Sequence, residues 1–247
     1  MANWMDNLRV GKQAVPPRIC IYGGHGIGKS TLASRFPAPI FISTEDGIDS
    51  LDVTSFPKAE KIDDVVGSIK TLLKEEHEFK TVVVDSVDWL IEPLITTSVN
   101  AQYDEKQQAY GKGQMYMAEE FREILQGLDA LRMRRGMNVV LIAHAAVVKF
   151  EDPRTDPYDR YQPKLPKACN ALLQEWADVL AFAAFKVIIK KSDAKGFDTA
   201  KVRGTTNGDR LLHLVENPAY AAKNRYECPD DFEMTIDNII KYIPIAQ

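Results

Sequence analysis

The stretch CIYGGHGIGKSTLASRF, residues 20–36, places a glycine-rich loop between an apolar run and the start of an amphipathic pattern. Residues 23–30 match the spacing G-x-x-x-x-G-K-[S/T] at every defined position. Residues 18–22 are expected to form a buried strand, and residues 31–36 the helix that follows the loop. Glycines let the backbone turn its N–H groups inward and approach an anion closely. The stretch therefore predicts an α/β fold with a phosphate-binding loop (P-loop) after its first strand.

An ordinary glycine-rich turn is the alternative explanation, but it gives no purpose to a lysine and a serine directly after the last glycine. In a P-loop, Lys29 would reach the β- and γ-phosphates and the Ser30 hydroxyl would hold Mg²⁺. The dipole of the following helix would favour the same anion. ATP and Mg²⁺ are therefore the expected cofactors. The residues expected to contact the nucleotide are Gly23, Gly24, His25, Gly26, Ile27, Gly28, Lys29, Ser30 and Thr31.

The composition is that of a globular protein. The chain has 247 residues, of which 45% are hydrophobic and 27% charged, so it can bury a substantial core. A net charge of −4 excludes a global basic field, so any nucleic-acid site must be a local patch. Cys20, Cys169 and Cys228 have no spacing typical of a zinc site, which favours a reducing compartment.

No segment of the sequence predicts insertion into a membrane. The N-terminal stretch MANWMDNLRVGKQAVPP has no apolar core that could serve as a signal peptide. The most apolar stretches, VVLIAHAAVV and VLAFAAFKVII, are about half the length that a bilayer requires. The cytoplasm is therefore the expected location, with no membrane partner.

Apolar runs alternate with helical patterns along the chain, which favours a mostly parallel central sheet with helices on both faces. The clearest helix follows Met117, where apolar residues recur at three- and four-residue spacing until Arg134, Arg135 and Gly136 end it. A final helix is expected around 230–242. The core strands are expected at 18–22, 39–43, 80–84, 138–143 and 179–189.

Two acidic side chains are expected beside the P-loop because they follow apolar strands. Asp85 ends the run VVVD and is expected to bind Mg²⁺ through water or the Ser30 hydroxyl. No glutamate follows Asp85, so the carboxylate that orients water must come from elsewhere. Glu45 lies just past the second strand, at the edge where a parallel sheet binds its ligands, and could orient water against the γ-phosphate. Asp46 and Asp49 are the alternatives.

Together these motifs resemble the core of the RecA-like recombinases, a family of P-loop ATPases. FISTEDGID, residues 41–49, is similar to the segment that carries the catalytic glutamate of the family, and VVVDSVDWL, residues 82–90, is similar to its Walker B motif. The family places a polar phosphate sensor, typically glutamine, at the end of its next core strand, where this chain has His144. The resemblance implies one RecA-like ATPase domain over 16–247, preceded by an N-terminal arm over 1–15.

The resemblance also implies a homo-oligomer, a ring or a filament, with ATP at the subunit interfaces. AAKNRYECP, residues 221–229, is similar to the segment with which one subunit of the family contacts ATP on its neighbour. Lys223 and Arg225 match its two cationic positions and would stabilise the transferring phosphoryl group in trans. An exposed basic turn is the alternative.

Two polar segments, 96–116 and 147–168, match the positions of the loops with which the family binds DNA. Both interleave aromatic and basic residues, which suits single-stranded DNA because bases stack on rings while cations follow phosphates. In the second segment acidic residues nearly balance the charge of the basic ones, so a solvated lid is an equal alternative.

The compact chain resembles phage-encoded RecA-like ATP-binding proteins, the Sak-type single-strand annealing recombinases. The leading hypothesis is an Mg²⁺-dependent ATPase that binds single-stranded DNA and promotes phage recombination by annealing or strand pairing in a bacterial host. The alternatives are an ATP-dependent accessory, loader or motor in phage replication or packaging, and a nucleotide-gated binding module with incidental turnover. A small-molecule kinase and an AAA+ remodelling protein are disfavoured, since neither an Arg-rich lid nor a carboxylate pair with a helical lid domain is visible.

Overall fold

The computed structural model describes residues 15–191 and 202–247, together with residues 5, 8, 10 and 11. Ten of the fifteen residues of the predicted N-terminal arm, 1–15, therefore lie outside the described residues. The strands are β1 (Arg18–Gly23), β2 (Pro39–Ser43), β3 (Thr54–Ser55), β4 (Thr81–Asp85), β5 (Asn138–Phe150), β6 (Tyr158–Pro163), β7 (Val179–Lys191), β8 (Val202–His213), β9 (Lys223–Asn224) and β10 (Asp231–Glu233). The described strands form one sheet in the order β10-β8-β7-β1-β5-β4-β2-β3, with β6 paired to β5 and β9 to β7.

The centre of this sheet is parallel. Strands β7, β1, β5, β4, β2 and β3 run in one direction, and β8 and β10 extend the sheet in antiparallel fashion. Parallel strands that are buried on both faces have nearly continuous apolar sequences. The side chains of successive residues point to opposite faces of the sheet, so Cys20 and Tyr22 pack into one hydrophobic cluster while Ile19 and Ile21 pack into the other. The predicted mostly parallel α/β sheet is confirmed.

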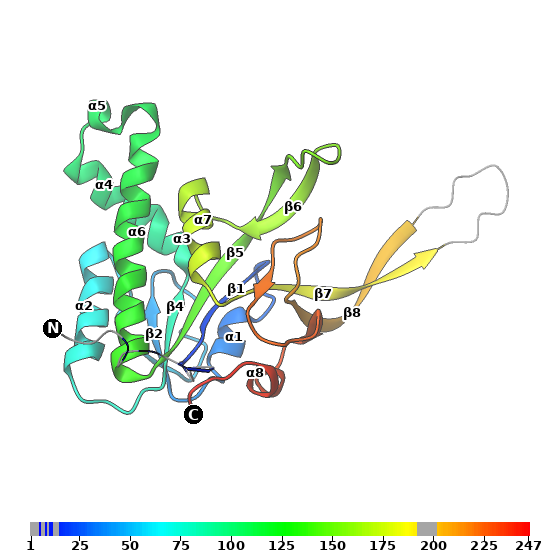
Figure 1. The fold of residues 1–247 in the computed structure, drawn as a ribbon, viewed down its shortest axis with the longest axis horizontal. Coiled ribbons are helices and arrows are strands. Elements are labelled where there is room, and N and C mark those ends of the chain that lie inside the picture. Colours follow the sequence, from blue (N-terminus) through cyan, green and yellow to red (C-terminus); the bar gives the residue numbers. More distant parts are fainter. Residues whose placement is uncertain (1–4, 6–7, 9, 12–14, 192–201) are drawn as a thin grey trace.

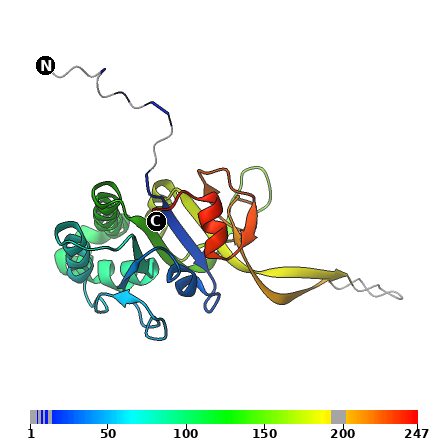
Figure 2. The ribbon, with the colours of Figure 1, turned by 90° about the horizontal axis from the view of Figure 1, so that it is seen from below.

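Helices cover both faces of the sheet (Figure 1). They are α1 (Lys29–Ala33), α2 (Ile62–Lys74), α3 (Val87–Trp89), α4 (Thr96–Gln102), α5 (Glu105–Gln108), α6 (Lys112–Ala130), α7 (Lys167–Trp176) and α8 (Ile236–Tyr242), with a 3₁₀ turn at Ala109–Gly111 and π-helical turns at Leu90–Ile95 and Leu131–Arg135. The apolar faces of α2, α6 and α7 pack into the first cluster, while α1 and α8 pack into the second. The C-terminus lies beside the start of β1 (Figure 2). There Ala246 N donates to Oδ1 of Asn138, the first residue of the neighbouring strand β5, at 2.7 Å.

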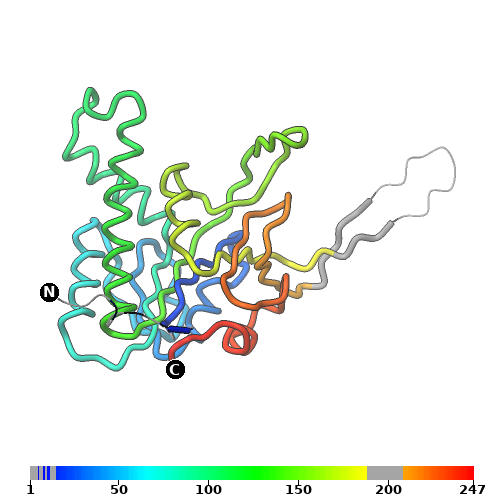
Figure 3. Tube along the Cα trace, in the orientation of Figure 1, coloured from blue at the N-terminus to red at the C-terminus, as the bar shows by residue number. Residues whose placement is uncertain are grey.

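The two polar segments form regular elements. Residues 96–116 contain α4, α5 and the first turn of α6, which starts earlier than the apolar pattern after Met117 indicates. Residues 147–168 contain an antiparallel hairpin, because β5 continues to Phe150 and pairs with β6. Figure 3 shows this hairpin projecting from the body. Figure 1 also shows β7 and β8 leaving the sheet together as a two-stranded ribbon.

The final helix is shorter than the sequence predicts, and the expectation is wrong over 230–235. Residues Asp231–Glu233 form β10 and pair with β8. Phe232 is therefore buried, as expected, but it belongs to a strand and not to a helix. The helix starts at Ile236 because the Thr235 hydroxyl accepts a hydrogen bond from Asn238 N at 3.3 Å. None of the described helices is long and apolar enough to cross a membrane.

Candidate functional site

The P-loop connects β1 to α1 at the carboxyl edge of the parallel strands. Gly26 and Gly28 have φ angles of +70° and +96°, a left-handed conformation that favours glycine. At Gly23 a Cβ atom would lie 2.4 Å from the carbonyl oxygen of Ala183, so only glycine fits against β7. The predicted strand and loop are therefore present, and the helix that follows covers Lys29–Ala33, earlier than the predicted 31–36. The glycines allow both the left-handed turns and the close approach to β7.

Lys29 points back into this loop. Its Nζ donates to the carbonyl oxygens of Gly23 at 3.1 Å and Gly24 at 3.0 Å, and the residue is 6% exposed. Burial lowers the pKa of Lys29, and the carboxylates of Asp85 and Asp88 partly offset that effect. The ammonium group can therefore exchange the carbonyl oxygens of the loop for phosphate oxygens.

A cavity of about 340 Å³ at this edge brings together most of the residues that the sequence predicts. Glu45 follows β2, Asp85 ends β4 and His144 lies in β5, and all three side chains line the cavity. Ile27 is part of the loop but is buried in the core, where it is 3% exposed. The P-loop residues that line the cavity are His25, Gly26, Gly28, Lys29, Ser30 and Thr31.

Oxygen atoms that suit Mg²⁺ gather at the end of β4. Burial raises the pKa of Asp85, and a hydrogen bond from the Ser30 hydroxyl works against that rise. The Ser86 hydroxyl oxygen beside them is buried without a hydrogen-bond partner. No group of three or more His, Cys, Asp or Glu side chains in the described part of the chain could hold a metal. The site therefore fits Mg²⁺ held by Asp85 and Ser30 together with the phosphates of a nucleotide.

Glu45 is fixed in position by the residue before it. The Thr44 hydroxyl donates to Ser86 O at 2.7 Å and accepts from Ser86 N at 2.9 Å, while Thr44 N donates to Asp85 O at 2.9 Å. These bonds tie the end of β2 to the end of β4. Glu45 and Asp85 are therefore held at adjoining places in one cavity.

The alternative carboxylates differ from Glu45 in their surroundings. Asp46 also lines the cavity, but both of its carboxylate oxygens accept from Lys58 Nζ at 2.8 Å, and its side chain is 82% exposed. Asp49 is exposed and does not line the cavity. This arrangement favours Glu45 as the carboxylate that faces the P-loop.

His144 is held by a buried acid that the sequence analysis missed. Asp88 Oδ2 lies 2.7 Å from the Nδ1 atom of His144, and Asp88 Oδ1 accepts from His144 N at 3.0 Å. Burial would raise the pKa of Asp88, but its bonds to His144 bring it below the ordinary value. The His144 ring also stacks on His25 of the P-loop, with ring centroids 4.1 Å apart. The spacing VVVDSVD, with a second aspartate three residues after Asp85, is the signal that could have identified Asp88.

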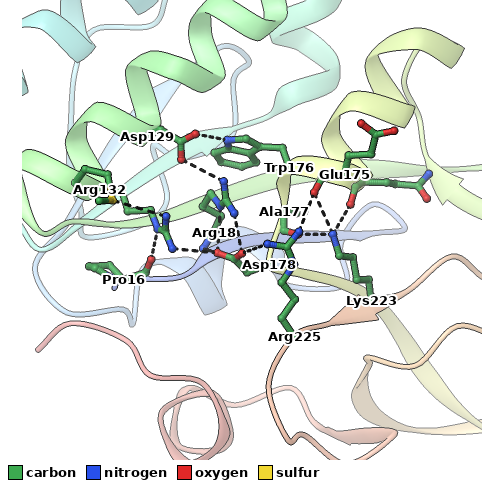
Figure 4. A network of polar contacts seen from close by, with 12 residues as sticks. Pro16, Arg18, Asp129, Arg132, Glu175, Trp176, Ala177, Asp178, Lys223 and Arg225 are labelled. Carbon is green, nitrogen blue, oxygen red and sulfur yellow. Dashed lines mark hydrogen bonds and ion pairs between the residues drawn. The ribbon is translucent and has the colours of Figure 1, made fainter. Parts of the chain in front are cut away.

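Lys223 and Arg225 lie away from this cavity, near the start of β1 rather than its end (Figure 4). Lys223 Nζ donates to the carbonyl oxygens of Gln174, Glu175 and Ala177 at 2.8–3.1 Å, which caps the C-terminus of α7. Arg225 donates to Asp178 at 3.0 Å and to Glu175 O at 3.3 Å. Both cations therefore have partners within their own chain, and their action on a neighbour's ATP stays a prediction.

Asp178 is the centre of this second network. Its carboxylate accepts three hydrogen bonds from Arg18, at 2.8–3.1 Å, and one from Arg225. Arg132 Nη2 lies 3.6 Å from the same carboxylate. The side chain of Asp178 is 6% exposed, so these cations supply the interactions that water would otherwise provide. The network fixes the amino ends of β1 and β7.

Replacing Asp178 by asparagine is expected to lower the free energy of unfolding by about 3 kcal/mol, since it removes the nearer counter-charge of the mostly buried Arg18 and leaves only Asp129, at 3.4 Å. Burial would raise the pKa of Asp178, but the hydrogen bonds and charge of Arg18 hold it below its ordinary value. Such a carboxylate stabilises the fold above its unfolded pKa and loses that contribution as the pH falls through its folded pKa. Thermal unfolding followed by circular dichroism should therefore separate the variant from the wild type at neutral pH, and less so in acid.

Asp46→Asn is the matched control for this prediction, because its ion pair with Lys58 is exposed and such pairs contribute little. Equal unfolding temperatures for Asp178→Asn and the wild type at neutral pH would contradict a stabilising role for the network.

A P-loop, a Walker B aspartate and a carboxylate from the neighbouring strand define the class of protein as a P-loop NTPase of the ATPase type. The chain belongs to the family described as "AAA domain", whose model matches residues 15–226. It is similar to the SPbeta prophage-derived uncharacterized protein YorG of Bacillus subtilis (strain 168), with 24% identity over 236 residues. The match covers 91% of this chain and 65% of the length of that relative.

The family match bears on two expectations from the sequence. It agrees with the predicted P-loop fold, and it carries the AAA description rather than that of a recombinase. The RecA-like and Sak-type parts of the resemblance therefore stay predictions.

Proposed function

We propose that this chain is an Mg²⁺-dependent ATPase that binds single-stranded DNA and promotes phage DNA recombination by annealing or strand pairing. The observation that supports the ATPase proposal is the meeting of Lys29, Glu45 and Asp85 in one cavity. The phage context rests on the prophage origin of the relative in Bacillus subtilis. The ATPase proposal and the phage context are also supported by the resemblance of the motifs to RecA-like proteins.

In this proposal each of these side chains has a part in ATP hydrolysis. Lys29 would neutralise the β- and γ-phosphates, while Ser30 and Asp85 would hold Mg²⁺. Glu45, at the adjoining edge, would orient water for attack on the γ-phosphate. His144, held by Asp88, would present its ring to the same phosphate.

A direct hydrogen bond supports coupling between this cavity and the β5–β6 hairpin. Lys164 N donates to His144 O at 2.8 Å, so the end of β6 is attached to the proposed phosphate sensor. Asp88, which holds His144, also lines a second cavity of about 400 Å³. Trp89 lines that second cavity and is 46% exposed, so its ring is available for a base to stack on.

The cations of the second polar segment differ in whether they already have partners. Arg154 pairs with Asp152, and Arg160 is buried against Glu216 and the ring of Phe150. Lys164 and Lys167, by contrast, are exposed, and no ion pair holds either of them within the described residues. In the first polar segment, Tyr103 and Tyr116 stack on each other with ring centroids 3.8 Å apart. The hairpin side is therefore the better candidate for a DNA contact.

The experiment that tests the proposal is ATP turnover with and without single-stranded DNA, together with the mass of the protein by light scattering. Stimulation by DNA supports the coupled ATPase, and annealing of complementary strands supports the recombination role. Stimulation without annealing would indicate a loader or motor. Nucleotide binding with a turnover that DNA does not change would indicate a gated binding module and contradict the proposal.

Replacing Lys164 and Lys167 together by alanine is expected to weaken single-stranded DNA binding and to make its salt dependence shallower. Each phosphate contact contributes about 0.7 to the slope of log affinity against log salt, so the slope should fall by about one to two units. Fluorescence anisotropy at several salt concentrations measures this slope. Lys70→Ala with Lys74→Ala removes two exposed lysines from α2 and serves as the control. An unchanged slope would assign the hairpin segment to a lid.

Assembly into a ring or filament, with Arg225 acting on the ATP of a neighbour, is the remaining part of the proposal. Mixing Arg225→Ala with Lys29→Ala protein tests it, because an interface that joins an intact P-loop to an intact Arg225 should regain turnover. Full activity of Arg225→Ala as a monomer would contradict this part.

A further inference from the structure

Arg210 reaches the P-loop from a strand that the sequence analysis did not connect to the site. It lies in β8 opposite Phe185 of β7, and its carbonyl oxygen accepts from Met234 N at 2.9 Å. A Cβ atom placed on Gly28 would lie 2.6 Å from the Nη1 atom of Arg210. The guanidinium group therefore lies directly against Gly28, the residue before Lys29.

The surroundings of this guanidinium group indicate an anion. Arg210 is exposed, and within the described residues no hydrogen bond or ion pair holds its side chain. Gly28 directly precedes α1 and lies in the loop whose backbone N–H groups would bind phosphate. The ammonium group of Lys29 is in the same loop. A guanidinium group without a partner beside a phosphate-binding loop can donate hydrogen bonds to an anion held there.

We propose that Arg210 binds the phosphate chain of the nucleotide within its own subunit. This inference rests on the proposed nucleotide-binding function. The sheet order places β7 and β8 on one side of β1, and β5, β4 and β2 on the other. Glu45, Asp85 and His144 belong to the second side, so Arg210 approaches from the opposite flank of the loop.

This position assigns Arg210 to the α- and β-phosphates. The groups that would act on the γ-phosphate and on Mg²⁺ lie on the far flank, beyond Lys29. A guanidinium group can donate two parallel hydrogen bonds to phosphate oxygens, which a lysine cannot do. Arg210 is then a binding residue for ADP as well as for ATP, and it connects the base of the β7–β8 ribbon to the bound nucleotide.

The test measures the affinity of the full chain for ADP and for inorganic tripolyphosphate, each with Mg²⁺, by competition against a fluorescent ADP analogue. Arg210→Ala is expected to weaken ADP binding by about 10- to 100-fold, as for loss of a hydrogen bond to a charged group. The binding of tripolyphosphate should weaken by a similar factor. The affinity of Arg210→Lys for both ligands should lie between those of the alanine variant and the wild type. Lys186→Ala removes an exposed cation from the neighbouring strand and should bind ADP normally.

Two results would overturn the assignment. Unchanged ADP affinity in Arg210→Ala shows that the side chain does not bind the nucleotide. Weaker ADP binding with unchanged tripolyphosphate binding shows that it recognises the nucleoside instead. Since Arg210 is exposed, the fold should survive the substitution, and circular dichroism checks this.

A Lys29→Ala arm separates this inference from the proposed function. If Lys29→Ala loses ADP binding while Arg210→Ala binds normally, the P-loop is correct and only the inference about Arg210 fails. If Lys29→Ala binds ADP as tightly as the wild type, the nucleotide site itself is wrong and both proposals fail.

Discussion

Replacing Lys29 by alanine is expected to abolish ATP turnover and to weaken nucleotide binding strongly. Of the described residues that line the 340 Å³ cavity, Lys29 is the only lysine or arginine, and it is the residue that a P-loop uses to reach the β- and γ-phosphates. Its Nζ is already placed inside the loop by the carbonyl oxygens of Gly23 and Gly24. A steady-state assay of phosphate release and a titration with a fluorescent nucleotide measure the two effects.

The control for this substitution is Lys58→Ala. Lys58 lies near the same edge of the sheet, but its ammonium group pairs with Asp46 and is half exposed. It should keep near-normal turnover. Because Lys29 also binds the loop carbonyls, circular dichroism must show that the Lys29→Ala protein is folded. Near-normal turnover in the folded variant would falsify the active P-loop.

Replacing Glu45 by glutamine is expected to slow hydrolysis by roughly 10²–10⁴-fold while ATP and Mg²⁺ binding stay close to normal. The amide keeps the shape of the side chain and removes the basic oxygen that would orient or deprotonate water. The bonds from Thr44 to Ser86 that position residue 45 do not involve its side chain, so the fold should be unaffected. Single-turnover hydrolysis at saturating ATP separates the chemical step from binding.

Asp46→Asn is the matched variant for this prediction. In the wild type the carboxylate of Asp46 is one residue after Glu45 in the chain and is paired with Lys58. Turnover should therefore continue in Asp46→Asn. Loss of turnover in Asp46→Asn, with normal turnover in Glu45→Gln, would mean that the neighbouring carboxylate orients the water.

The parts of the site that could be predicted from the sequence are those encoded in short stretches. Gly23 to Ser30 carry their own spacing, and Asp85 and Glu45 each follow an apolar run, which places them at the carboxyl edge of a parallel sheet. The strands are recognisable because burial on both faces demands continuous apolar residues. These local rules were sufficient for the central sheet and for the main lining of the cavity.

The parts that escaped prediction depend on contacts between distant segments. Arg210 reaches Gly28 only because β8 folds back along β7, and the hydrophobic pattern does not specify that position. Phe232 is apolar in a helix or in a strand, so its pattern could not distinguish β10 from the first turn of α8. Lys223 and Arg225 matched a family segment in sequence, yet the structure also gives them partners in α7 and Asp178.

Strand β5 runs without interruption from the buried sheet into the projecting hairpin, and this continuity makes it a lever. His144 is the last buried residue of the strand, and Phe150 ends it six residues later, a span of about 20 Å at the usual rise of a strand. A tilt of about 5° at His144 would therefore move the tip by about 2 Å. The ladder of hydrogen bonds between β5 and β6 makes the lever stiffer than a single strand. A probe at the hairpin tip, such as a spin label, would thus report on a small rotation beside the proposed position of the γ-phosphate.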